Sequence, residues 1–119
     1  MDSTRKKTVQ RGEIWHVRFD PVEGSEIGKI RPALVLQNDL GNRYANTTIV
    51  AAITGMIKNL PTLVNVDPST QNGLARRRAI NLSHIRTVSQ SRLIRRIGKI
   101  EAKYLPPIRE AVLLSLGFE

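Results

Sequence analysis

Residues 24–39 read GSEIGKIRPALVLQND, and residues 48–54 read TIVAAIT. In the first stretch a glycine-rich turn leads into Arg31, and Pro32 then opens an apolar run that predicts a buried strand. Proline biases the residue before it towards an extended conformation, so we expect the Arg31 guanidinium to project from a rigid strand end. The second run predicts another buried strand, which ends at Thr54. The two runs therefore place two groups that can bind a phosphate at the borders of a hydrophobic sheet.

Further strand patterns lie on both sides of these two runs. Residues 13–19 alternate apolar and polar side chains, and residues 63–66 and 80–88 alternate again. Trp15 and Phe19 share one face of the first of these strands, so we expect them in the core and not as platforms for stacked bases. The spacing of these short segments predicts a mainly β domain.

The loops and the end of the chain complete this pattern. Turn-forming residues predict a loop or short helical turn over residues 39–46 and a loop over residues 68–73. Apolar residues from Leu105 to Leu116 fall at helical spacing, with prolines near the start and Gly117 just past the end. We therefore predict a small, closed or nearly closed antiparallel sheet followed by a C-terminal helix.

The length of 119 residues predicts one domain with a modest core. We expect residues 1–8 to form a flexible basic tail and residues 9–119 to form the domain. The sequence has no apolar stretch long enough to span a membrane and no signal-peptide pattern. The expectation is a cytoplasmic protein with no membrane partner.

The chain has no cysteine and only two histidines, His16 and His84. The absence of cysteine excludes disulfides, a thiol nucleophile and a cysteine-based zinc site. Two histidines are too few for a histidine-rich metal site. We therefore expect neither a metal nor a cofactor.

The charge balance points to a polyanionic partner. The chain has 19 lysines and arginines against 10 acidic residues, a net charge of +9, and 13 of the basic residues are arginine. Arginine has the side chain best shaped for bidentate phosphate contact. The competing explanation is a basic surface that only keeps the protein soluble, because net charge reports on non-specific association and not on fold.

Six short motifs, in this order and spacing, resemble the MazF/PemK family of toxin endoribonucleases from toxin–antitoxin pairs. The resemblance covers about residues 9–118. The motifs are Arg11-Gly12-Glu13-Ile14-Trp15, Asp20-Pro21, Gly24-Ser25-Glu26, Arg31-Pro32, Ala52-Ile53-Thr54 and Ile85-Arg86-Thr87.

This resemblance implies a fold and a set of partners. It implies an SH3-like small barrel with a C-terminal helix, the fold of the MazF, PemK and CcdB toxins, assembled as a homodimer. It implies single-stranded RNA as the substrate. It also implies a cognate antitoxin whose acidic, flexible tail folds onto the basic groove and neutralises the toxin.

The expected chemistry follows from the residue types. Without metal ligands, an RNA-cleaving protein must use the 2′-hydroxyl of RNA as nucleophile, and the protein then stabilises charge. Arg31 can bind phosphate oxygens in a forked geometry and Thr54 can donate one more hydrogen bond, so we expect both to be catalytic. The alternative roles are a strand-end salt bridge for Arg31 and an ordinary β-branched strand residue for Thr54.

Proton transfer is less well defined by the sequence. Arginine has a pKa above about 12 and is a poor general base at neutral pH, although the family gives its equivalent of Arg31 an acid/base role. Glu26 and His84 are candidate helpers because they ionise nearer neutrality. A simpler role for Glu26 is to orient the turn or Arg31.

Substrate binding is expected in two places, the loop before Arg31 and the strand around His84. The residues expected to bind RNA are Ser25, Glu26, Lys29, His84 and Arg86. Here the sequence departs from the family, which often has an acidic residue and a glutamine where this chain has Ser83 and His84. A base contact by that glutamine amide therefore cannot be transferred to this chain.

A second departure is the triplet Arg76-Arg77-Arg78, which replaces a segment that commonly includes an acidic residue and serine in the family. A charged triplet is most often a solvated loop, and that is the favoured interpretation. Otherwise the triplet tracks the RNA backbone.

Two other functions are open at this point. The gyrase-poisoning toxins share the fold and act by binding alone, through a C-terminal tryptophan segment. This chain ends Leu116-Gly117-Phe118-Glu119 and has its one tryptophan at position 15, which disfavours that function. A non-catalytic basic RNA-binding barrel would explain the charge but has no need of Arg31 and Thr54. Cleavage of single-stranded RNA without metal separates the three.

Overall fold

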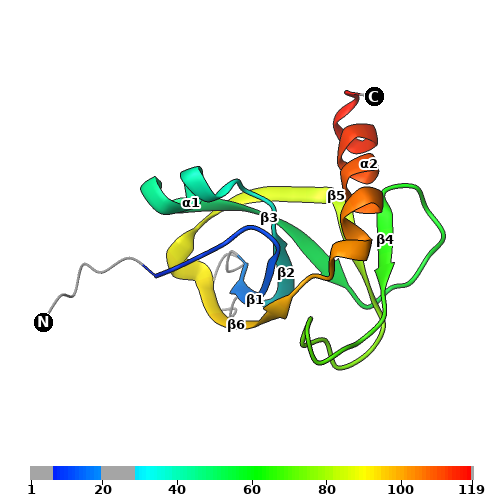
Figure 1. The fold of residues 1–119 in the computed structure, drawn as a ribbon, viewed down its shortest axis with the longest axis horizontal. Coiled ribbons are helices and arrows are strands. Elements are labelled where there is room, and N and C mark those ends of the chain that lie inside the picture. Colours follow the sequence, from blue (N-terminus) through cyan, green and yellow to red (C-terminus); the bar gives the residue numbers. More distant parts are fainter. Residues whose placement is uncertain (1–6, 20–28, 119) are drawn as a thin grey trace, which may run out of the picture.

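The computed structural model describes residues 7–19 and 29–118. Its strands form one six-stranded antiparallel sheet in the order β4-β5-β3-β2-β1-β6, which curls into a small barrel with α2 packed at one end (Figure 1). The elements are β1 (Glu13–Arg18), β2 (Ile30–Val35), α1 (Asp39–Tyr44), β3 (Thr47–Thr54), β4 (Leu63–Val66), β5 (Arg78–Ser89), β6 (Leu93–Lys99) and α2 (Leu105–Leu116), with 3-10 turns at Gln90–Arg92 and Ala102–Tyr104. The predicted mainly β fold with a C-terminal helix is confirmed.

The sheet separates two hydrophobic cores, because successive side chains of a strand point to opposite faces. The helix-side core lies against α2, and the barrel core lies on the other face. The helix-side core contains Ile14, Leu34, Ala51, Ile53, Val64, Val66, Leu74, Ile80, Leu82, Ile100, Ile108 and Ala111. The barrel core contains Val9, Trp15, Val17, Ala33, Val35, Val50, Val88 and Leu93, with Phe19 packed against it. Trp15 and Phe19 are core residues, as predicted.

Both helices have the boundaries that their sequences favour. Helix α2 has its prolines in the first turn and ends at Gly117, whose φ of 80° is the left-handed conformation that glycine adopts without strain. Helix α1 occupies the segment predicted as a loop or helical turn, and the Asn38 side chain caps it by accepting a hydrogen bond from the Gly41 N–H. No helix among residues 7–19 and 29–118 is long and apolar enough to cross a membrane.

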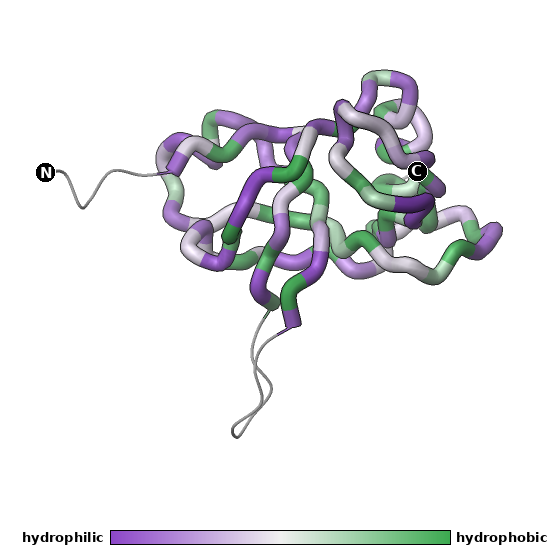
Figure 2. The backbone as a smooth tube through the Cα atoms, turned by 90° about the horizontal axis from the view of Figure 1, so that it is seen from below, coloured by the Kyte–Doolittle hydropathy of each residue, from purple (hydrophilic) through white to green (hydrophobic). Residues whose placement is uncertain are grey.

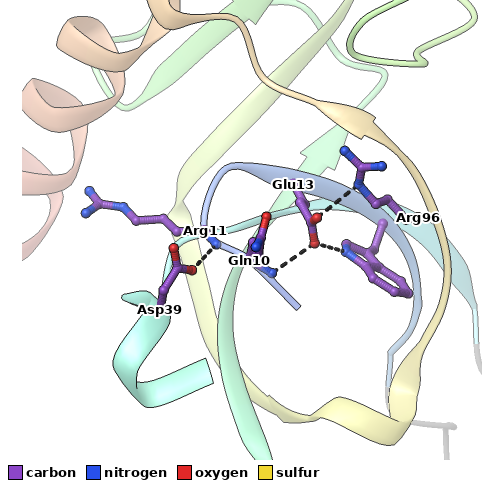
Figure 3. A network of polar contacts seen from close by, with 6 residues as sticks. Gln10, Arg11, Glu13, Asp39 and Arg96 are labelled. Atoms are coloured by element: carbon purple, nitrogen blue, oxygen red, sulfur yellow. Dashed lines mark hydrogen bonds and ion pairs between the residues drawn. The ribbon is translucent and has the colours of Figure 1, made fainter. Parts of the chain in front are cut away.

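The start of β1 is fixed by a buried carboxylate (Figure 3). Glu13, which is 5% exposed, accepts hydrogen bonds from Trp15 Nε1 at 3.0 Å and from the Gln10 N–H at 2.9 Å. Its other oxygen forms an ion pair with Arg96 Nε of β6 at 3.0 Å. The Arg11–Trp15 motif therefore joins β1 to β6 and belongs to the scaffold.

The N-terminal segment is held against this scaffold as far as it is described. Lys7 Nζ donates a hydrogen bond to the Leu93 carbonyl and lies 5.6 Å from the centre of the Trp15 ring. The predicted flexible tail, residues 1–8, otherwise lies outside the described residues. Lys7 and Thr8 are exposed, and Val9 is the first buried residue of the described chain.

The loop over residues 68–73 crosses β6 in direct backbone contact. A Cβ atom at Gly98 would lie 2.3 Å from the carbonyl carbon of Asn72, and one at Gly73 would lie 1.9 Å from the carbonyl oxygen of Ile97. Only glycine leaves room for such a crossing. Beyond it, Leu74 is buried in the helix-side core, so the chain is anchored shortly before the arginine triplet.

Candidate functional site

Strand register brings Arg31 and Thr54 to the same end of neighbouring strands. Ala33 of β2 pairs with Ala52 of β3 in the antiparallel ladder. The ladder ends there, and Arg31 and Thr54 each lie two residues further along their strands, at the same edge of the sheet and on the face of the barrel core. The described ends of β1 and β2 project together from the body of the domain, so this is an accessible edge (Figure 2).

The two side chains are available to a ligand in different ways. Arg31 is exposed, and among residues 7–19 and 29–118 no carboxylate forms an ion pair with it. Thr54 is half-buried, and its Oγ1 accepts a hydrogen bond from the Met56 N–H at 3.1 Å. That bond uses an oxygen lone pair and orders the turn, so the hydroxyl hydrogen stays available to a phosphate oxygen.

Two more predicted binding residues, Lys29 and Arg86, belong to the same face. The Phe19 N–H donates to the Lys29 carbonyl at 3.0 Å, which continues the pairing of β1 with β2 and aligns Lys29 with Arg31. The Arg86 guanidinium carbon lies 5.3 Å from the centre of the Phe19 ring. Arginine stacks favourably on an aromatic ring. The face therefore gathers positive charge from β2 and β5 around the rim of the barrel core.

His84 lies in an irregular part of β5. Ala51 of β3 pairs with Ile85, but the next residue, Ala52, pairs with Asn81, so Leu82, Ser83 and His84 have no partners on β3. Such a bulge re-aims side chains away from the regular pleat. Ser83 and His84 are exposed, and Ser83 Oγ donates to Thr62 Oγ1 at 2.9 Å. The strand predicted over residues 80–88 is part of β5, and the bulge within it was not predicted.

The structure divides the predicted site between described and undescribed residues. Ser25 and Glu26 lie outside the described residues, so their predicted roles stay predictions. Arg31, Thr54, Lys29 and Arg86 share one face, and His84 stands on the bulge of the strand that carries Arg86. In the described part of the chain, no three His, Cys, Asp or Glu side chains gather closely enough to hold a metal ion.

Sequence reasoning did not connect the arginine triplet to Thr54. A Cβ atom at Gly55, the residue after Thr54, would lie 3.1 Å from Nη2 of Arg76 and 3.6 Å from Nη1 of Arg78. Arg77 points elsewhere and pairs with Asp67 Oδ1 at 3.2 Å. Arg76 lies in a bend and Arg78 begins β5, so no regular period within the triplet could have separated Arg77 from its neighbours.

Known proteins of similar sequence identify the family of this chain. A family model described as the PemK-like, MazF-like toxin of type II toxin–antitoxin systems matches residues 10–116. The chain is 42% identical to endoribonuclease EndoA of Bacillus subtilis over 111 residues, 92% of this chain and 95% of that protein. It is 39% identical to endoribonuclease MazF of Staphylococcus saprophyticus, covering 92% of each.

Solved structures give the same result for the fold. The Mycobacterium tuberculosis toxin MazF-mt6 superposes with a TM-score of 0.77 at 25% identity, over 90% of this chain and 98% of that one. A MazE–MazF structure from Deinococcus radiodurans gives a TM-score of 0.80 at 24% identity, over 95% and 99% of the two chains. The family match over almost the whole sequence, together with relatives of this identity, shows that the chain belongs to the PemK-like, MazF-like toxin family of type II toxin–antitoxin systems.

Proposed function

We propose that this chain is a sequence-specific endoribonuclease toxin that cuts single-stranded RNA without a metal ion. The observation that supports the proposal is that exposed Arg31 and half-buried Thr54 follow the end of the β2–β3 ladder at the same edge of the sheet. The relatives named endoribonucleases, EndoA and MazF, support the same activity. The alternatives that act by binding alone assign no role to Arg31 and Thr54.

In the proposed reaction the 2′-oxygen of the RNA attacks the adjacent phosphorus. The 2′-hydroxyl gives up its proton, a new 2′-O–P bond forms, and the bond from phosphorus to the 5′-oxygen breaks. The leaving 5′-oxygen takes a proton, so the products are a 2′,3′-cyclic phosphate and a 5′-hydroxyl. Negative charge grows on the phosphate oxygens in the transition state, where Arg31 can bind two of them and Thr54 can donate to one.

The remaining predicted residues take supporting roles in this proposal. Arg31 acts mainly through its charge and could donate the proton to the leaving oxygen, because arginine stays protonated at neutral pH. His84, exposed on the β5 bulge, can offer a ring nitrogen to an unpaired base. Lys29 and Arg86 hold the backbone, and Ser25 and Glu26 are proposed to complete the substrate-binding loop.

The deciding experiment is RNA cleavage by purified protein in excess chelator. We expect cuts in single-stranded RNA that leave 5′-hydroxyl ends and 2′,3′-cyclic or 3′-phosphate ends. End-specific ligation and sequencing of the products would identify both ends and the preferred cut site. Strict dependence on added divalent metal, or 5′-phosphate products, would refute the mechanism.

We further propose that the protein is a homodimer. Large apolar side chains at the end of the molecule that carries α2 remain exposed, namely Leu105, Leu114, Leu116 and Phe118. A groove of about 1010 Å³ beside α2 is lined by residues such as Leu36, Val112 and Leu113. A second copy of the chain would cover this surface. Sedimentation at micromolar concentration should give the mass of two chains, and a monomer would refute this part of the proposal.

The proposed regulator is a cognate antitoxin with an acidic, flexible tail. The family is that of toxins from type II toxin–antitoxin systems. The face around Lys29, Arg31 and Arg86 offers charge complementary to such a tail, which would occupy the RNA site in the cytoplasm, where the RNA substrate is made. Saturating antitoxin should abolish both RNA binding and cleavage, and unchanged RNA affinity would refute this mode of inhibition.

A further inference from the structure

We propose that Arg76 and Arg78 form a second phosphate-binding position, on the turn after Thr54, for a nucleotide that neighbours the cleaved one. The proposal rests on the proposed endoribonuclease function and assigns the part of the RNA that this segment contacts. Arg77, in the same triplet, is assigned to the scaffold. The triplet therefore performs two different tasks.

The first support is proximity to the candidate catalytic strand end. The guanidinium nitrogens of Arg76 and Arg78 that approach Gly55 would be 3.1 and 3.6 Å from a Cβ atom there. Gly55 directly follows Thr54, and the absence of a side chain is what lets two arginines reach the turn. A phosphate bound between them would belong to the same stretch of RNA as a phosphate bound at Thr54.

The second support is charge. In the described parts of the chain, neither Arg76 nor Arg78 has an ion pair, whereas Arg77 between them has one with Asp67. Two guanidinium groups that gather at one point without a carboxylate repel each other, and a bound anion would reverse the sign of that interaction. Their forked donors match the geometry of phosphate oxygens.

The third support is that the arginines stand on a fixed base. Asn72 is fully buried, and its Oδ1 accepts hydrogen bonds from the Leu74 N–H at 2.9 Å and the Ser69 N–H at 3.1 Å. Leu74 is itself buried, and Arg78 begins β5, paired with Val66 of β4. The triplet is thus held at both ends, although the side chains of Arg76 and Arg77 are exposed to solvent.

Salt-dependent RNA binding tests the proposal, with Arg77 as the matched control. The variants Arg76→Ala, Arg78→Ala and Arg77→Ala each remove one positive charge from the same triplet. The probe is a single-stranded RNA of mixed sequence with 2′-O-methyl riboses throughout, which cannot be cleaved by attack of a 2′-hydroxyl. The dissociation constant is measured by fluorescence anisotropy over a series of salt concentrations, after melting curves have confirmed that each variant is folded.

We expect Arg76→Ala and Arg78→Ala each to make the plot of the logarithm of the dissociation constant against the logarithm of salt concentration less steep by about 0.7. This is the value for one lost phosphate contact on a single strand. Arg77→Ala should lower the slope by less than half as much. Equal slopes for all three variants would overturn the proposal. So would variants at positions 76 and 78 that bind RNA normally but lose affinity for the antitoxin, because that result would assign the pair to carboxylates of the protein partner.

The same preparation separates this proposal from the proposed function. If the wild-type protein cuts RNA in chelator and the three slopes are equal, only the second phosphate position is wrong. If the wild-type protein cuts no RNA under any condition, the endoribonuclease function fails, whatever the slopes are. Arg76→Lys provides a further check, because it keeps the charge and should keep most of the slope while losing the forked geometry.

Discussion

Arginine is used in opposite ways at the two ends of β1. At its start, Arg96 neutralises the buried carboxylate of Glu13, which also binds Trp15 and Gln10. Near its other end, Arg31 of β2, which pairs with Val17, is exposed with no ion pair in the described part of the chain. The charge at the first place is matched within the protein, whereas at the second no carboxylate in the described part of the chain matches the charge of Arg31. The difference predicts which substitutions will damage the fold and which will damage activity.

The largest expected effect is on catalysis, at the end of β1 that lies beside Arg31. Arg31→Ala and Thr54→Ala should each slow RNA cleavage by about 10²-fold or more, the loss typical of one transition-state hydrogen-bond donor. Because neither side chain is buried in a core, the melting temperature should stay close to that of the wild type. Single-turnover cleavage and thermal melting measure the two quantities on one sample. A folded Arg31→Ala protein with the wild-type rate would remove Arg31 from the catalytic site.

At the start of β1 we expect the reverse, because replacing Gly98, which pairs with Ile14, should damage the fold. In Gly98→Ala the new methyl group would meet the Asn72 carbonyl carbon at 2.3 Å, a backbone contact that no rotamer change relieves. We expect a loss of about 3 kcal/mol or more in the free energy of unfolding, measured by urea denaturation. Gly117→Ala is a useful control, because a Cβ there meets nothing within 4 Å and only the positive φ is strained. Equal losses for the two variants would mean that the crossing is looser than described.

Replacing the buried carboxylate is a more moderate test of the same region. Glu13→Gln keeps a carbonyl oxygen for Trp15 and Gln10 but removes the charge opposite Arg96, and should cost about 1–2 kcal/mol of stability. Arg96→Ala tests whether solvent can reach the Glu13 carboxylate, because the Arg96 side chain is 51% exposed and the Glu13 side chain is 7% exposed. If solvent reaches it, the loss of stability should be smaller than the loss on breaking a fully buried ion pair. RNA affinity should change little in Glu13→Gln. A selective loss of RNA binding without destabilisation would assign this carboxylate to the site.

The smallest expected effect is a change in acid stability near the loop over residues 68–73. Burial acts to raise the pKa of Glu101, but hydrogen bonds from Ser69 and Asn72, with the charge of Lys103, outweigh it and hold the pKa below its usual value of 4.5. The charged form therefore stabilises the fold above about pH 4.5, and that contribution is lost as the pH falls through the lowered pKa. Glu101→Gln should be less stable than the wild type at neutral pH, and the difference should shrink in acid. Melting temperatures measured from pH 7 to pH 3 would decide, and a constant difference would contradict the linkage.

The features that sequence predicted well are those fixed by neighbours along the chain. The apolar runs before Leu36 and Thr54, and the helix with prolines at its start and Gly117 at its end, are local patterns, and each became the expected element. The family resemblance supplied the fold, since periodicity alone could not choose a barrel. The ends of the two apolar runs pointed to Arg31 and Thr54, and the resemblance implied their role; both lie at the same edge of the sheet, beyond the last pair of the β2–β3 ladder.

The features that sequence missed depend on pairing between distant segments. Three residues of β5 have no partners on β3, so β5 is longer than the part of β3 with which it pairs. No pattern within residues 80–88 could reveal this difference in length. The approach of Arg76 and Arg78 to Gly55 likewise depends on where β5 begins against β3. Asn72 and Glu101 were also missed, because their bonds join a loop to a segment about 30 residues away.

The β5 bulge has a consequence for how such a toxin can change over evolutionary time. The ladder between β3 and β5 continues with a shifted register on the other side of Leu82, Ser83 and His84, so the strands stay joined around the two exposed positions. Substitutions at Ser83 and His84 can therefore be sampled with little penalty to folding. Under the proposed role of His84 in contacting a base, a few changes there would alter the target preference while the scaffold stays the same.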